Sequence, residues 1–92
     1  MSAIDEMEME LSMENGMKKA RVEELMEKKN EFTVLSDISV SFAHNEPDPD
    51  SKREEMALSI MITVKRMNRM SEKQKRVLIA CLVERRFAGY QW

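Results

Sequence analysis

Residues that usually build catalytic or metal sites are scarce in this chain of 92 residues, which has two glycines, two prolines, one cysteine and one histidine. A single cysteine excludes an internal disulfide and is typical of a reducing compartment, so we expect an intracellular protein, cytoplasmic or nuclear. Two glycines are too few for a glycine-rich phosphate loop. His44 has no second histidine to complete a zinc site, and Cys81 has no base beside it. We therefore expect no enzyme, no metal and no cofactor.

Long apolar runs are also absent. The longest, Val77–Val83, is far shorter than the roughly 18–20 residues that cross a bilayer. The first residues have neither the basic stretch nor the apolar stretch of a secretory signal. We expect no membrane span and no export signal.

Acidic and basic residues are separated along the chain. Residues 1–50 carry 5 basic and 13 acidic side chains, whereas residues 51–92 carry 10 basic and 4 acidic ones, which gives net charges of −8 and +6. This asymmetry indicates an anionic partner for the second half, or charge pairing between the two halves within or between chains.

Two capping boxes mark the C-terminal half. In Ser51–Glu54 and in Ser71–Gln74, a serine is followed three residues later by Glu or Gln, which is a helix-start signal. Each precedes an apolar-rich segment, and Gly89 is a plausible terminator of the second. Residues 51–92 are therefore predicted to form a basic, antiparallel helical hairpin.

Apolar residues occupy more than one face of both predicted hairpin helices. Leu58 and Ile62 lie off the main stripe of the first helix, and Ile79 and Val83 lie off that of the second. A helix that is apolar on several faces is buried on several sides, and a chain this short covers little surface by itself. We therefore predict a homodimer that also binds another protein. The predicted interface consists of Ile60, Met61, Val64, Met67, Val77, Leu78, Cys81 and Leu82.

Basic side chains gather around the predicted turn of the hairpin. They are a candidate anion-binding site that could contact nucleic-acid phosphates. No aromatic residue is interleaved with them, which argues against stacking on single-stranded bases. A solvated turn or a docking surface for the acidic half is the favoured interpretation. The six residues are Lys65, Arg66, Arg69, Lys73, Lys75 and Arg76.

The first half of the chain divides into two segments. Residues 1–30 consist largely of strong helix formers, so we predict an acidic helical arm that is broken or bent near Asn15-Gly16. Residues 31–50 differ, because their apolar side chains alternate with polar ones before an acidic loop with two prolines. That alternation predicts a half-buried β-strand over residues 32–42. The expected fold is one small, mainly α domain. The alternating residues are Phe32, Val34, Ile38, Val40 and Phe42.

The C-terminal half resembles the BESS motif, through Ser59–Met67 and through Met70–Lys75 followed by Val77 and Leu82. In that family the motif is a helical pair through which transcription regulators associate with themselves and with one another. The resemblance implies an association module that acts in transcriptional regulation.

A strand followed by two helices is also similar to the ribbon-helix-helix repressors, in which two strands pair across a dimer. That resemblance implies DNA binding, yet Asp37, Ser39 and Ser41 occupy the exposed strand positions where base-reading side chains would be needed. We therefore expect a non-enzymatic, self-associating interaction module. The alternatives are a small regulator or inhibitor that binds a partner enzyme, and a DNA-binding repressor of the ribbon-helix-helix type.

Overall fold

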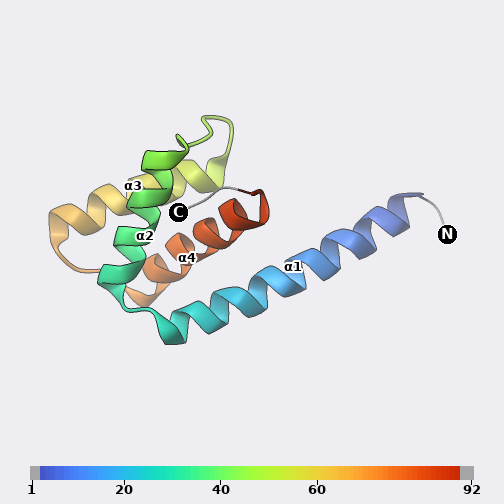
Figure 1. The fold of residues 1–92 in the computed structure, drawn as a ribbon, viewed down its shortest axis with the longest axis horizontal. Helices are drawn as coiled ribbons and strands as arrows, with labels where there is room; N and C mark the ends of the chain where they lie inside the picture. Colours follow the sequence, from blue (N-terminus) through green and yellow to red (C-terminus); the bar gives the residue numbers. More distant parts are fainter. Residues whose placement is uncertain (1–2, 90–92) are drawn as a thin grey trace.

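The computed structural model describes the backbone of residues 3–89 and the side chains of residues 16–89. The protein is mainly α-helical, as predicted. Helices α3 and α4 form an antiparallel hairpin, and α2 crosses it (Figure 1). The second half of α1 lies along α4, while its first half extends away from the other helices (Figure 1). Within the described chain, no helix is both long and apolar enough to cross a membrane. The helices are α1 (Ala3–Lys28), α2 (Glu31–His44), α3 (Lys52–Met67) and α4 (Glu72–Phe87).

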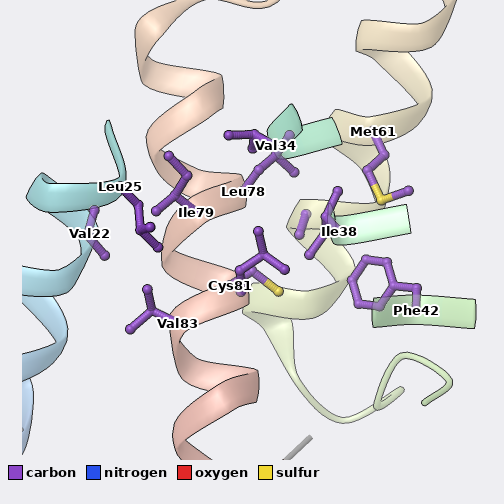
Figure 2. Close-up of a cluster of buried hydrophobic side chains, with 12 residues drawn as sticks. Val22, Leu25, Val34, Ile38, Phe42, Met61, Leu78, Ile79, Cys81 and Val83 are labelled. Atoms are coloured by element: carbon purple, nitrogen blue, oxygen red, sulfur yellow. The ribbon is translucent and has the colours of Figure 1, made fainter. Parts of the chain in front are cut away.

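Helix α4 is the central element of the fold, because it contacts each of the other three helices. Its apolar residues form the continuous run Val77–Val83, and successive residues of a helix point about 100° apart. Some members of the run therefore face α1 while others face α2 and α3. Figure 2 shows Ile79 and Val83 next to Val22 and Leu25 of α1, with Leu78 on the other side of α4. The second apolar face of α4 is thus covered within a single chain.

The hairpin helices begin and end at the predicted signals. The Ser71 hydroxyl accepts a hydrogen bond from the Gln74 amide at 3.1 Å, and the Gln74 side chain accepts one from the Ser71 amide at 2.9 Å. Ser51 also caps its helix, accepting from the Glu54 amide at 3.3 Å. The Glu54 carboxylate does not complete the capping box by accepting from the Ser51 amide, because it is paired with the buried Arg85. Gly89 adopts a positive φ of 92° just after the last helix, as a C-terminal glycine does.

The predicted strand over residues 32–42 is wrong, because this segment is helix α2. Val34, Ile38 and Phe42 are spaced four residues apart, a spacing that fits a strand and a helix equally well. Burial of these three side chains against α4 favours the helix over the β preference of the branched residues. Asn30 caps the helix by accepting a hydrogen bond from the Thr33 amide at 2.9 Å. Because residues 32–42 are helical, they do not supply the β-ribbon of a ribbon-helix-helix repressor.

The predicted break at Asn15-Gly16 is also wrong, because α1 is a single helix through both residues. A glycine inside a helix costs only about 0.5–1 kcal/mol relative to alanine. The acidic arm is therefore one continuous helix.

Candidate protein-interaction surface

The structure divides the predicted interface residues into two groups. Five of the eight belong to the core of a single chain, so in this fold they are not available to a partner. The other three remain at the surface of the α3–α4 pair, where Ile60 and Val77 are half-buried and Met67 is 50% exposed. The five core residues are Met61, Val64, Leu78, Cys81 and Leu82.

Two separate hollows lie between α3 and α4, on the side of the hairpin that carries Met67. One, of about 500 Å³, is lined by Met56, Val77 and Ala80, among other residues. The other, of about 390 Å³, lies next to Met67 and the loop between the helices. The two hollows together are called the α3–α4 groove below, and methionine or small aliphatic side chains line part of each. Its full lining is Lys52, Arg53, Met56, Thr63, Met67, Arg69, Met70, Ser71, Gln74, Arg76, Val77 and Ala80.

A second apolar surface lies between α2 and α3. Phe32 is 80% exposed and lines a hollow of about 410 Å³ together with Leu35 and Lys65. Leu58 and Ile62 precede Lys65 by seven and three residues, so they share its face of α3. Phe32, Leu35, Leu58 and Ile62 are called the α2–α3 patch below. The sequence placed Phe32 inside a strand, so this patch was not predicted.

The six predicted anion-binding residues do not act as one cluster. Lys75 is buried, and its Nζ donates to the Met26 carbonyl at 3.0 Å, near the end of α1. Arg76 forms an ion pair with Glu23, and this hydrogen bond raises the pKa of the Arg76 guanidinium. Both residues therefore hold α1 against α4. The remaining four are exposed and make no ion pair with the part of the chain that the structure describes: Lys65, Arg66, Arg69 and Lys73.

The acidic and basic halves do pair within the chain, at its α1–α4 contact. Glu23 contacts Arg76, and the cationic Lys75 lies at the negative end of the α1 dipole. The acidic residues involved come from the second half of α1. The first half, which holds five acidic residues and no basic one, lies beyond this contact.

A buried arginine, Arg85, was missed by the sequence reasoning. Its side chain is 2% exposed, yet every polar atom has a partner: it pairs with Glu54, donates from Nε to the Ser41 hydroxyl at 2.7 Å, and donates to the carbonyls of Ser41 and Asn45. Its guanidinium also lies 4.6 Å from the centre of the Phe42 ring. Arg85 therefore joins α2, α3 and α4 and is a structural group.

Cys81 and His44, the two single residues considered as catalytic groups, lie in different environments. Burial raises the pKa of the Cys81 thiol to about 12, so the thiol stays protonated near neutral pH. No group of three or more His, Cys, Asp or Glu side chains within residues 16–89 is arranged to hold a metal ion. His44 is exposed near the end of α2. The features that remain are uncovered apolar surfaces and the cations beside them.

Comparisons of this chain with protein-family models, with curated proteins and with solved structures give no match.

Proposed function

We propose that this protein is a non-enzymatic interaction module that associates with itself. One observation carries the proposal: after the four helices have closed a common core, large apolar side chains are left uncovered on neighbouring surfaces of α2 and α3. Phe32, Ile62 and Met56 are the most exposed of them, at 80%, 61% and 54%. Contiguous apolar surface of this kind on a small protein is typical of a protein-binding face.

A dimer interface would use only a small part of the surface of this chain. A stable interface buries about 800 Å² on each partner, which is roughly an eighth of the 6675 Å² that one chain exposes. The α2–α3 patch and the α3–α4 groove flank the same helix, α3. Methionine side chains in the groove adapt to the shape of a partner, which favours protein contacts over a shaped small-molecule site.

Nucleic-acid binding has weaker support. Four cations around the hairpin loop lack an ion-pair partner among residues 16–89, but Lys75 and Arg76 are used to hold α1. One exposed aromatic side chain, Phe32, lines a hollow with Lys65 and Arg69, but a few surface cations alone give weak, sequence-independent phosphate binding. Action in transcriptional regulation, which the BESS resemblance implies, would then come through protein contacts.

The test is the mass of the full chain in solution, with one substitution on each surface. At about 50 μM, well above a micromolar dissociation constant, light scattering should give the mass of a dimer. Ile62→Asp in the α2–α3 patch or Met67→Asp in the α3–α4 groove should reduce that mass, because a carboxylate in an apolar interface is costly. Both residues are exposed in one chain, so the fold should survive.

Thr33→Asp is the matched control. Thr33 is exposed on α2 and lines none of the three hollows, so the same added charge should leave the dimer intact. A monomeric mass for the unmodified chain at 50 μM would reject self-association and would favour the alternative, a small regulator that binds a different protein.

A further inference from the structure

The first half of α1 has no neighbouring helix along its length. At about 1.5 Å per residue, the 26 residues of α1 span about 39 Å, whereas the 16 residues of α4 span about 24 Å. Contact with α4 is made through Val22 and Leu25, in the second half of α1. The remainder of the helix runs past the end of α4 where the last helix stops (Figure 1). About 15 Å of helix therefore has no counterpart in the fold.

The sequence of this projecting segment is acidic and rich in methionine. Residues 4–14 contain five acidic residues and no basic one: Asp5, Glu6, Glu8, Glu10 and Glu14. Ile4, Met7 and Leu11 follow one another at the helical spacings of three and four, while Met9 and Met13 fall on the opposite side of the helix. Two such segments repel each other, so the charge of the segment favours a basic partner surface.

The α3–α4 groove has matching properties. Its lining includes Met56 and Met67, each about half exposed. Lys52 lines one end of it and Arg69 the other, and neither forms an ion pair with a residue in the 16–89 range. The two hollows lie toward opposite ends of α3, whose 16 residues span about 24 Å, and the 11 residues of the segment span about 16 Å. The segment is therefore short enough to lie along α3 between the two cations.

A chain cannot place this segment in its own groove without breaking α1. The helix is continuous through Gly16, and its first half points away from the hairpin loop that carries Arg69 (Figure 1). A second copy has no such constraint. Two copies can exchange the segment reciprocally, each arm lying in the groove of the other, as in an isologous dimer.

We propose that the α3–α4 groove binds the acidic first half of α1, residues 4–14, from a second copy of this chain. The proposal rests on the proposed self-association and specifies the two surfaces that meet. Opposite charges select this pairing over contact between two acidic arms, and the apolar row at positions 4, 7 and 11 meets the methionines of the groove.

The experiment exchanges the charges of the two surfaces in the full chain. The arm variant is Glu6→Lys/Glu10→Lys, and the groove variant is Lys52→Glu/Arg69→Glu. Neither pair of substitutions should destabilise its helix. In the unmodified arm, Glu6, Glu10 and Glu14 are spaced four apart and repel one another, and the lysines remove that repulsion. Lys52 lies in the first turn of α3, where an acidic residue is preferred. Each variant alone should dissociate at least about tenfold more readily at 0.1 M salt.

A mixture of the two variants gives the decisive measurement. In a one-to-one mixture, the reversed arm faces the reversed groove and the native arm faces the native groove, so a heterodimer of normal affinity should form. Glu46→Lys/Glu55→Lys is the matched control, since it changes the charge by the same amount at exposed positions outside the arm and should dimerise normally. Circular dichroism on each variant establishes that it is folded.

Failure of this proposal can be distinguished from failure of the proposed function. If the unmodified chain is monomeric at 50 μM, both are rejected. If both charge variants dimerise normally while Ile62→Asp is monomeric, the protein associates through the α2–α3 patch and the arm-in-groove contact is rejected alone. The contact is likewise rejected if both charge variants are folded and monomeric but their mixture forms no heterodimer.

Discussion

Replacement of Arg85 by methionine should destabilise this protein more than any other single change of a charged residue. The substitution keeps most of the apolar volume of the side chain but removes its ion pair with Glu54, its hydrogen bonds to Ser41 and its bond to the Asn45 carbonyl. The Glu54 carboxylate, only 13% exposed, would be left without its partner. Breaking a buried ion pair from one side costs about 3–5 kcal/mol.

That loss is large relative to the stability of the whole chain. At about 0.05–0.15 kcal/mol per residue, a protein of this length unfolds with about 5–14 kcal/mol. With an m-value of about 1.5 kcal/mol/M, the midpoint of urea unfolding should fall by about 2–3 M. Arg66→Met is the control, because Arg66 is exposed on α3 and should change stability by less than about 0.5 kcal/mol.

The assay is urea unfolding followed by circular dichroism, at a low protein concentration so that association contributes little. Adding Glu54→Leu to Arg85→Met should recover part of the lost stability, since the unpaired carboxylate is then absent. If Arg85→Met unfolds within about 1 kcal/mol of Arg66→Met, the reasoning that Arg85 holds α2, α3 and α4 together is refuted.

Three further changes test other contacts of the fold. Lys75→Met should lower the free energy of unfolding by about 1–2 kcal/mol, because the Lys75 Nζ donates a hydrogen bond to the Met26 carbonyl. Lys73→Met, on the exposed side of α4, should have almost no effect. Equal losses in urea unfolding would contradict the role of Lys75 in holding α1 against α4. Gly16→Ala should stabilise α1 by about 0.5–1 kcal/mol and increase helicity, since an added Cβ has no atom within 4 Å; a decrease in the signal at 222 nm would show that the helix is not continuous there. Cys81 should resist iodoacetamide at pH 8 until urea unfolds the chain, and rapid labelling of the native protein would contradict its burial. Because the Cys81 pKa is raised from 9.0 to about 12 in the folded protein, only the unfolded thiol ionises between pH 9 and 12. The free energy of unfolding should therefore fall as the pH rises through this range.

The sequence predicted the hairpin because its helix signals are local. Ser51 and Ser71 cap their helices through bonds to residues three positions away, and local bonds of this kind can be read without knowing the fold. The strand prediction failed because residues spaced by four satisfy a period of two as well as the helical period. The polar Ser36, which breaks the alternation, and the cap at Asn30 were the signals that favoured a helix.

The candidate surface was harder to predict for a different reason. Apolar stripes identify the residues that become covered but not the element that covers them. Leu78 and Cys81 were assigned to a dimer, although the hairpin and α2 cover them within one chain. Likewise, no local signal marks Arg85 as buried, because its partners Ser41 and Glu54 come from α2 and α3.

Self-association can be measured by sedimentation equilibrium of the full chain between about 1 and 100 μM. If the chain dimerises, its average mass should rise with concentration from the 10.8 kDa of one chain to twice that value. A mass that stays at 10.8 kDa across the whole range would contradict self-association and the arm-in-groove contact with it.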